Sequence, residues 1–588
     1  MLYAILPIVI GASYLLRAKW RAEARAAEFK ALNPGVPVKI IFSDIILLNL
    51  LASLKVLPKA WFLKITGVEK GWESEADSPL YKNNPHGVIV FASPSKLSVT
   101  IADPEYSKEI TTRNKDFPKP IEIYGVLDIF GKNVVTLEKE EWRRHRKVVA
   151  PRFGEKNNAL VHVQTARIAK NMFEAWERNF QVPSSSSSSS SDSKPSYLVD
   201  VSADMMKLAL HVISAAGFGK YIDWDADEGY EGKKAAIPAG HRLSFVDALQ
   251  TSVENINLKL VVPKWAYNLP IKKLEETQVA FEEFGAYLTD LIRAADATKE
   301  DQKDNLLSSL VEATRAGNEG QGLSESEVLG NVFIFMFAGH ETTAGTLAYA
   351  LALLAFYPEK QQRLHEEIDR VLGGKHPAYK QQAELTYTLA IMNEVLRVYP
   401  PVVGIPKSTN AQTQNQSLYS TVSGKLTIPP NTYISVHAMA LHHNAKAWGP
   451  DPLVFRPERW LKEGAESNPH SRSGTPLPQD LNGASVDGGL VADPNTLRKP
   501  APGSFVPFSE GARGCIGKRF AQVEFVAALA MIAQRYEWTT TPGAKIEEVL
   551  RSRSTVTLRP YEHTKLIFRR RDNLSAETLA PPVLVTAN

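Results

Sequence analysis

Cys515 is the only cysteine among the 588 residues of this chain, so the fold contains no internal disulfide. It lies in a loop with three glycines, FSEGARGCIG over residues 508–517, and an apolar helical pattern follows the loop directly. Arg513 stands two residues before the thiol, and both a nearby cation and the N-terminus of a helix favour the thiolate form. A chain without disulfides suits a reducing compartment or a domain that faces the cytosol.

A lone cysteine can belong to several kinds of site. Most lone cysteines are small buried residues without chemistry, and a catalytic nucleophile would need a histidine partner that sequence alone cannot place. A phosphate-binding loop is excluded because Ala512 stands where a glycine is required, and Arg519 replaces the Ser or Thr after the lysine. Glycines let a backbone approach a flat group closely, and a thiolate is one of the few protein ligands of haem iron. The loop therefore indicates a haem-thiolate site.

A second pattern predicts a long helix from Ser324 to Phe356. Ser324 and Glu327 have the spacing of a capping box, and the run ends just before Pro358. Its apolar stretch is interrupted by AGHETT over residues 338–343. A glycine within a helix costs about 1 kcal/mol relative to alanine, and a carboxylate inside an apolar helix is costly unless it meets water or a ligand. Either this helix reaches a ligand, or its polar side simply faces solvent.

Two charged patterns complete the motifs. Glu394 and Arg397 are three residues apart on one face of an apolar helix, and Arg459 in PERW (457–460) is a candidate third member of a buried cluster. Trp142 and Arg146 are one turn apart on a basic helix and face the same way. By itself such a basic run would be a solvated surface.

These motifs resemble, in the expected order, those of the cytochrome P450 superfamily over roughly residues 86 to 570. The pattern Phe-x-x-Gly-x-Arg-x-Cys-x-Gly resembles its haem-binding loop, and the Gly-x-Glu-Thr segment resembles its oxygen-activating helix. The resemblance implies the haem-thiolate fold, mainly α with a small β lobe near the N-terminus. It points to fungal microsomal members in particular.

The resemblance also implies a role for each motif residue. Cys515 would be the axial ligand of haem b, and Glu341 with Thr342 would relay protons during oxygen activation. The residues implied to contact the haem are Trp142, Arg146, Phe508, Arg513 and Lys407. Lys407 stands where the family commonly has an arginine and lacks the bidentate fork of that residue. Glu394, Arg397 and Arg459 would have a structural role.

The implied reaction is the insertion of one oxygen atom from O2 into a lipophilic small molecule, by hydroxylation or epoxidation, in secondary metabolism. The sequence has no Gly-x-Gly-x-x-Gly for a nicotinamide or flavin domain, so we expect electrons from an NADPH–haemoprotein reductase, with cytochrome b5 as a second donor. The basic side chains expected to dock that partner are Arg143, Arg144, Lys147, Lys518 and Arg519. The formal net charge of +4 is too small to indicate nucleic-acid binding.

Two other functions fit the same fold. Some family members are isomerases or dehydratases that need no reductase, and a haem-binding sensor or carrier would have no turnover. The intact pair Glu341 and Thr342 argues against both, because neither function needs a proton relay.

The N-terminal part predicts a membrane anchor with a proline hinge over residues 1–38. Leu2–Leu16 is apolar and is followed by Arg17, Lys19, Arg21 and Arg25, which places the remainder in the cytosol on the positive-inside rule. The apolar run is shorter than the roughly 20 residues of a typical span, and the alternative is a buried helix of a soluble protein. Ile40–Leu57 suits an interfacial helix. The expected location is the membrane of the endoplasmic reticulum.

The remaining chain is expected to form one catalytic domain over residues 39–571, followed by a disordered tail at 572–588. Flexible inserts are expected at 183–196, which contains eight consecutive serines, and at 462–502. His86–Ala92 and Lys96–Ala102 are predicted strands. The substrate pocket is expected between Ile121–Phe130, Phe333–Phe337, Val402–Ile405 and Thr555–Leu558, with Leu258–Trp265 reaching the membrane.

Overall fold

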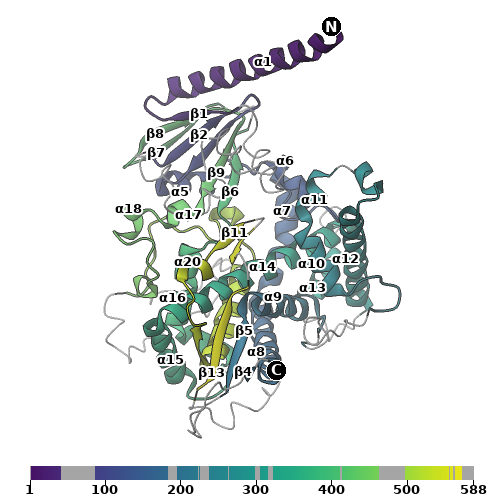
Figure 1. Cartoon of the computed structure of the whole chain (residues 1–588), viewed down its shortest axis with the longest axis vertical. Coiled ribbons are helices and arrows are strands. Elements are labelled where there is room, and N and C mark those ends of the chain that lie inside the picture. Colours follow the sequence, from purple (N-terminus) through teal and green to yellow (C-terminus); the bar gives the residue numbers. More distant parts are fainter. Residues whose placement is uncertain are drawn as a thin grey trace.

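The structure is a computed structural model that describes residues 2–41, 86–179, 181–182, 195–222, 224, 237–262, 264–297, 305–315, 322–410, 414–462, 497–554, 557–560 and 563–571. A mostly helical body carries a small β lobe at one end, and a long N-terminal helix lies across the outer edge of that lobe (Figure 1). The predicted mainly α fold with a small β lobe is confirmed.

The centre of the helical body is α14 (Glu325–Phe356), whose residues are buried along most of its length. Ser324 caps it: its hydroxyl accepts from the Glu327 amide at 3.3 Å, and the Glu327 carboxylate accepts from the Ser324 amide at 2.9 Å. The predicted helix is therefore confirmed at both ends. The other long helices of the body are α8 (Glu155–Asn179), α9 (Val201–Val212), α10 (Phe245–Glu254), α12 (Lys272–Ala297), α13 (Leu306–Arg315), α15 (Pro358–Leu372), α16 (Thr386–Val398) and α19 (Lys518–Arg535).

Further helices lie between these elements. They include α5 (Pro104–Thr112), α6 (Ile121–Tyr124), α7 (Lys139–Val149), α11 (Ile256–Val261), α17 (Ala438–His442), α18 (Ala445–Trp448) and α20 (Ile546–Val549). Asp103 caps α5 by accepting from the amides of Glu105 and Tyr106. This cap fixes the start of α5 directly after the β lobe strand that ends at Ile101.

Among the described residues, the β lobe is a five-stranded sheet in the order β1-β2-β3-β9-β6. Its strands are β1 (Val38–Ile40), β2 (Val88–Ala92), β3 (Leu97–Ile101), β6 (Gly404–Ser408) and β9 (Thr432–His437). Every residue of β2 and β3 is buried, and the two strands predicted at His86–Ala92 and Lys96–Ala102 are confirmed. β6 and β9 join from a segment about 300 residues further along the chain, which the sequence pattern did not reveal.

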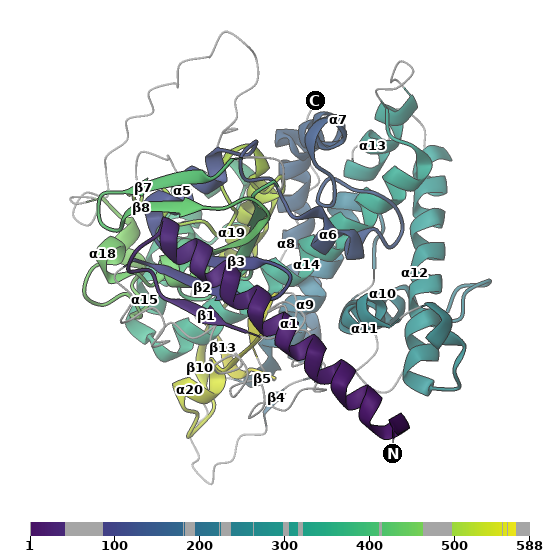
Figure 2. The ribbon, with the colours of Figure 1, turned by 90° about the horizontal axis from the view of Figure 1, so that it is seen from above.

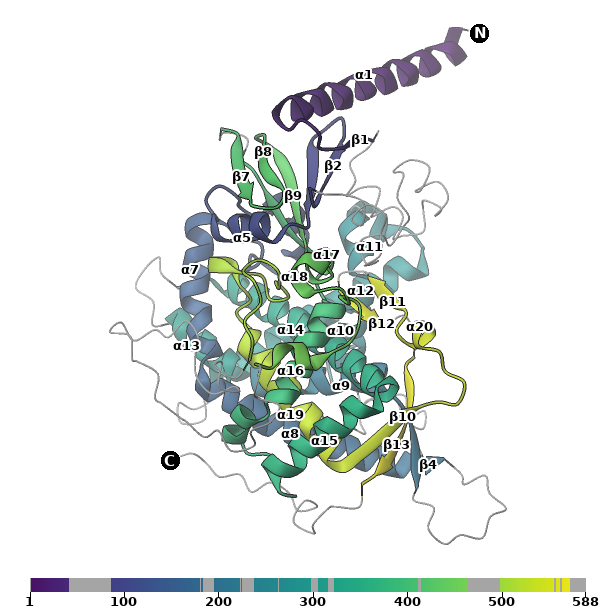
Figure 3. The same cartoon turned by 90° about the vertical axis from the view of Figure 1, so that its left-hand side faces the viewer.

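A second sheet and two hairpins complete the strands. Within the described part of the chain, β10 (Tyr536–Thr540), β13 (Lys565–Arg570), β5 (Ser196–Asp200) and β4 (Gln181–Val182) form a four-stranded sheet in that order (Figure 3). The hairpins are β7 (Gln416–Ser420) with β8 (Gly424–Ile428), and β11 (Ser552–Ser554) with β12 (Leu558–Pro560). The second sheet packs on the body through aromatic rings, with Trp176 and Phe568 4.8 Å apart between centroids.

The N-terminal helix α1 (Leu2–Leu32) extends well beyond the apolar segment expected to form it. Its C-terminal half packs on the β lobe, where Ala26 and Phe29 are buried and Asn33 exchanges two hydrogen bonds with the Thr427 backbone at 2.7 and 2.8 Å. Figure 2 shows the helix crossing the lobe and projecting past it. No helix in the described part of the chain is both long and apolar enough to cross a membrane.

The described residues cover the predicted proline hinge, but only small parts of the predicted interfacial helix and of the two inserts. The proline hinge corresponds to the turn between α1 and β1, where Gly35 has a φ of 89°. The interfacial helix at Ile40–Leu57 lies outside the described residues from residue 42 onward, as do most of both inserts and the tail at 572–588.

Candidate active site

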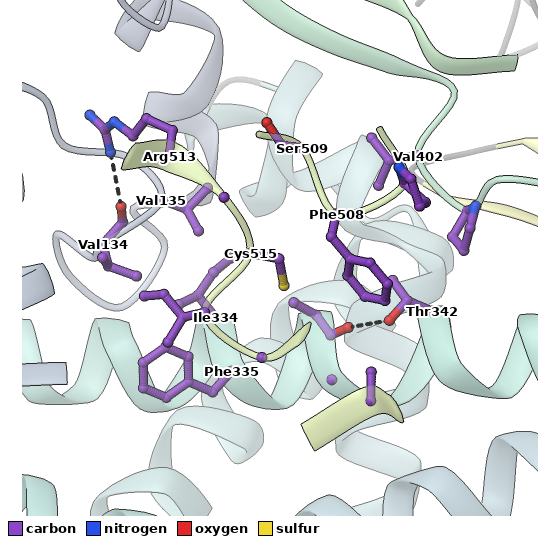
Figure 4. Close-up of a pocket in the computed structure, with 18 of the residues that line it drawn as sticks. Val134, Val135, Ile334, Phe335, Thr342, Val402, Phe508, Ser509, Arg513 and Cys515 are labelled. Carbon is purple, nitrogen blue, oxygen red and sulfur yellow. Dashed lines mark hydrogen bonds between the residues drawn. The ribbon is translucent and has the colours of Figure 1, made fainter. Parts of the chain in front are cut away.

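A cavity of about 370 Å³ lies in the centre of the molecule, a volume typical of small-molecule sites. The Cys515 loop, the middle of α14, α7 and the segment from Pro401 to Lys407 enclose it (Figure 4). Most of its wall is apolar, including Val134, Ile334 and Phe335. The site therefore combines an apolar interior with a small number of polar groups.

The Cys515 loop is held in place by backbone contacts. The Cys515 amide donates to the Phe508 carbonyl at 2.8 Å, and the Gly514 amide donates to Gly511 at 2.9 Å. Gly511 has a φ of 68°, and a Cβ there would lie 2.6 Å from the Thr111 carbonyl, so only glycine fits against α5. The loop thus directs the Cys515 sulfur into the cavity toward α14, beside the Phe508 ring (Figure 4).

The electrostatics of Cys515 differ from the expectation. Burial raises the pKa of the Cys515 thiol, and the amides of Gly517 and Lys518 together with Arg146 oppose that rise only in part. Arg513, expected to favour the thiolate, turns away toward the Val134 and Leu137 carbonyls and Glu138. The predicted contribution of the helix N-terminus is present in the amides of Gly517 and Lys518, whereas the arginine that favours the thiolate is Arg146 and not the expected Arg513. A metal ion bound to the sulfur would supply the missing positive charge.

Trp142, Arg146 and Arg513 form one cluster beside the loop. The Arg513 guanidinium lies 3.9 Å from the centroid of the Trp142 ring and pairs with Glu138 at 2.5 Å. Arg146 lies 5.9 Å from the same ring and donates to the Gly514 carbonyl at 3.1 Å. Trp142 and Arg146 face the cavity together, as their one-turn spacing indicates.

Two lysines complete the charged side of the cavity. Lys407 is buried and lies 3.4 Å from Asn114. Lys119, which sequence reasoning missed, donates to the Val135 carbonyl at 3.1 Å and lies over the Tyr124 ring at 4.5 Å. Burial, reinforced by repulsion from Arg513 and Lys407, lowers the pKa of Lys119 to about 7. Burial likewise lowers the pKa of Lys407 to about 8. No periodicity or motif marks Lys119, so only the fold identifies it.

The residues present fit a haem. Of the described residues, Lys119, Arg146, Lys407 and Arg513 bring positive charge to the cavity, and Glu138 is the carboxylate that pairs with this group. This excess of buried positive charge matches a ligand with two carboxylates. The Cys515 thiol, which lines the same cavity, matches a metal ion at the centre of such a ligand. The described residues contain no rival cluster of His, Cys, Asp and Glu that could hold a metal.

The two members of the predicted acid–alcohol pair face different ways. Thr342 lines the cavity with Ala338 and Gly339, and its hydroxyl donates to the Ala338 carbonyl at 2.9 Å (Figure 4). Glu341 is buried outside the cavity wall and forms an ion pair with Arg559 at 3.3 Å. The structure therefore places Thr342 at the site and Glu341 behind it.

Glu394, Arg397 and Arg459 lie together beneath the site. Both Glu394 and Arg397 are fully buried, with Arg397 donating to the two carboxylate oxygens at 2.8 and 2.9 Å. Arg459 donates to the same carboxylate at 2.8 Å, and Trp460 does so at 2.9 Å. This cluster joins α16 to the segment that follows α18, and every oxygen of the buried carboxylate is satisfied.

The expected substrate walls are only partly present in the cavity. Tyr124, Ile334, Phe335, Val402 and Ile405 line it. Thr557 and Leu558 do not, because the β11–β12 hairpin lies behind Pro401, and residues 555–556 fall outside the described residues. In the stretch expected to reach the membrane, Trp265 is 69% exposed.

Three of the five expected docking cations have partners within the protein. Arg144 pairs with Glu327 at 2.5 Å, and Arg143 pairs with Glu140. Arg519 lies 3.4 Å from the Tyr379 hydroxyl and 3.8 Å from Glu155. Lys147 and Lys518 are the better candidates for contact with another protein.

Comparisons with known proteins agree with this geometry. The family model described as Cytochrome P450 matches residues 81–567. A cytochrome P450 monooxygenase of Postia placenta is 34% identical over 81% of this chain and 84% of its own length. One from Arthrobotrys oligospora is 30% identical over 87% of this chain and 88% of its own length. Among solved structures, the cytochrome P450DA heme domain superposes with a TM-score of 0.63 at 21% identity, covering 83% of this chain and 91% of that one.

Proposed function

The chain belongs to the cytochrome P450 family, and we propose that it inserts one oxygen atom from O2 into a lipophilic small molecule, by hydroxylation or epoxidation, in secondary metabolism. Its named fungal relatives are monooxygenases, and membership makes this chain an oxidoreductase of that kind. The observation that carries the proposal is the position of the Cys515 sulfur, which faces Thr342 across an apolar cavity with cations on one side.

The cofactor that we propose is haem b, held by Cys515 and by the cations of the cavity. Bound there, haem supplies the oxygen-activating chemistry, and a thiolate ligand favours cleavage of the O–O bond. Trp142, Arg146 and Arg513, with Lys119 and Lys407, would hold the two carboxylates of the haem. The apolar wall would orient a lipophilic substrate and keep water from the reacting atoms.

Thr342 is the proposed proton donor at the site, since it lines the cavity together with Ala338 and Gly339. Glu341 is its proposed source of protons from the solvent side. A hydroxyl can pass on a proton only when a second group replaces it, so the two residues would act in series.

We further propose that electrons come from an NADPH–haemoprotein reductase, with cytochrome b5 as a second donor, at the surface near Lys147 and Lys518. The proposed location is the endoplasmic reticulum membrane, with the catalytic domain on the cytosolic side and α1 as the anchor. The exposed Trp20 of α1 and Trp265 support lipid contact, because tryptophan favours the membrane interface.

The test is a reconstitution of the purified protein with a P450 reductase, NADPH, ¹⁸O₂ and a panel of lipophilic compounds. We expect NADPH consumption that depends on substrate, and one labelled oxygen atom in the product. An isomerase or dehydratase would convert its substrate without NADPH, and a carrier would form no product at all. Thr342→Ala should continue to consume NADPH while product falls and hydrogen peroxide rises, whereas Thr342→Ser retains the hydroxyl and the product.

A further inference from the structure

Glu341 sits in an unusual environment for a carboxylate. It is 2% exposed in the middle of α14, and it turns away from the cavity to meet Arg559 at 3.3 Å. An ionised carboxylate in such surroundings needs a cation. Burial lowers the pKa of the neighbouring His340, which is therefore neutral near pH 7 and does not supply that charge.

Arg559 reaches Glu341 because the β11–β12 hairpin lies directly on α14. A Cβ at Gly345 would lie 3.5 Å from the Leu558 carbonyl and 3.8 Å from the Arg559 Cβ, so β12 packs closely on the helix at this glycine. One turn further, the Tyr349 hydroxyl donates to Ser552 at 2.7 Å. Glu341, Gly345 and Tyr349 are successive positions four residues apart, so three consecutive turns of one helix face hold the hairpin.

The same hairpin also touches the wall of the cavity. The Leu558 amide donates to the Pro401 carbonyl at 2.8 Å, and Pro401 and Val402 both line the cavity. Arg559 is thus adjacent in sequence to a residue fixed on the substrate wall, while its own guanidinium is fixed on Glu341. Its side chain is 16% exposed, so it connects the buried carboxylate with the solvent side.

We propose that Arg559 is the positioning residue for Glu341: it holds the carboxylate in place for the proton relay, and the β11–β12 hairpin ties that relay to the substrate wall at Pro401. This inference rests on the proposed function, since a relay is needed only if oxygen is activated at the site. It assigns a role to a residue from the C-terminal hairpin, far from every motif of the sequence.

The test is a double-mutant cycle in the haem-loaded, reductase-coupled protein, using Arg559→Met, Glu341→Gln and the two combined. The first readout is product formed per NADPH consumed. We expect Arg559→Met to lower it on the order of tenfold, within the range of acid–base contributions. In the double variant, Arg559→Met should not lower the yield below that of Glu341→Gln alone. Arg559→Lys, which keeps the charge, should restore most of the yield.

Two additional readouts separate positioning from folding. Hydrogen peroxide released per NADPH consumed should rise in Arg559→Met, because the relay carboxylate is no longer held in place, and stay near the wild-type level in Arg559→Lys. Amide hydrogen exchange in residues 557–560 should match wild type in both variants. The exposed Arg551 provides the control, and Arg551→Met should change neither the yield nor the release of hydrogen peroxide.

Each unfavourable result has a distinct meaning. If Arg559→Met lowers the product yield equally in proteins with Glu341 and with Glu341→Gln, the inference is overturned. It is also overturned if the yield falls and the amide hydrogens of the hairpin exchange fast in both Arg559 variants. An active wild type with an unaffected Arg559→Met overturns the inference alone. A wild type that forms no oxygenated product overturns the proposed function and this inference together.

Discussion

At the scale of single residues, charge near the cavity is the feature that most directly reports what the site binds. Lys119, Lys407, Arg146 and Arg513 are brought together in a low-dielectric interior at a cost that Glu138 offsets in part and that an anionic ligand would offset further. Burial and the neighbouring cations hold the pKa of Lys119 at about 7, far below that of an ordinary lysine. The affinity for a dianion must then depend on whether Lys119 carries its proton.

Haem retention should therefore weaken as the pH rises. Below about pH 7 Lys119 is charged before the ligand arrives, whereas above it a proton must be taken up on binding, so affinity falls as pH rises through that value. Lys119→Met should release haem faster than wild type, and its release rate should change less between about pH 6.5 and about pH 8.5. Haem transfer to an acceptor globin measures both rates. The exposed Lys545→Met is the control, and identical pH slopes in Lys119→Met and wild type would contradict the role of Lys119.

The Glu394 cluster predicts a large loss of stability when it is broken. Glu394→Gln leaves Arg397 and Arg459 buried without their carboxylate, which should lower the free energy of unfolding by about 3–5 kcal/mol. The matched control is the exposed pair of Arg143 and Glu140, where Glu140→Gln should cost less than about 1 kcal/mol. Denaturant unfolding followed by far-UV circular dichroism measures both, and equal losses in the two variants would show that the cluster is not a buried ionic centre.

Short-range patterns predicted which motif residues gather at the site, but not how each side chain points. Trp142 and Arg146 face the cavity together because their spacing is a property of one helix. Glu341 and Thr342 are adjacent, so a helix must direct them differently, and the partner of Glu341 comes from a hairpin more than 200 residues away. Lys119 and Arg559 lack a local pattern and are identified only by tertiary contacts.

At the scale of elements, the position of α14 depends on close backbone contacts near its start. A Cβ at Gly330 would lie 2.4 Å from the Gly131 carbonyl oxygen, and that neighbour is backbone, which cannot move as a side chain can. Gly330→Ala should therefore destabilise the protein by about 1–3 kcal/mol. Gly125 has a φ of −56° and no atom within 4 Å of a Cβ, so Gly125→Ala should be neutral or stabilising by up to about 1 kcal/mol. Thermal unfolding of the two variants tests this difference, and a Gly330→Ala protein as stable as wild type would refute the close contact.

The junction of α15 with β10 predicts an acid-sensitive element. His365 lies 3.2 Å from the Tyr536 carbonyl and donates to it, and burial lowers the pKa of His365 to about 4. The unfolded chain takes up this proton near pH 6.5, so the native state loses stability as pH falls from about 6.5 to about 4. His365→Gln keeps a donor without a titrating group.

Between about pH 7 and about pH 4.5, the free energy of unfolding of His365→Gln should fall less than that of wild type, by about 2 kcal/mol. Urea unfolding at the two pH values measures this difference. An unchanged slope in His365→Gln would remove the buried histidine from the account of acid sensitivity.

The elements predicted correctly are those whose own residues specify them. α14 has a capping box, a long apolar run and a proline shortly after its end, and β2 and β3 are short buried runs on either side of a turn. The four-stranded sheet was missed because its strands are scattered between residues 181 and 570, and two of them border a serine-rich insert. α1 continues past its apolar segment because Ala26 and Phe29 find a buried surface on the β lobe, which composition alone does not reveal.

At the scale of the whole molecule, the cavity exists only in the complete fold. Its walls come from Ile213 and from the segments around residues 119–153, 334–346, 392–407 and 507–521, which α14, α16 and the β lobe hold in place. No single segment contains both the thiol and the groups that face it. Stability and cofactor binding should therefore be linked, because a ligand that contacts all four segments stabilises the state in which they meet.

The most direct test of a haem-thiolate site is the visible spectrum of the purified, dithionite-reduced protein with carbon monoxide, recorded beside Cys515→Ser. We expect a strongly red-shifted Soret band in the wild type that is absent from the variant, because the band reports thiolate ligation of the iron. A spectrum typical of histidine-ligated haem in both proteins, or no haem in either, would contradict it and would leave Cys515 as a small residue facing an apolar cavity.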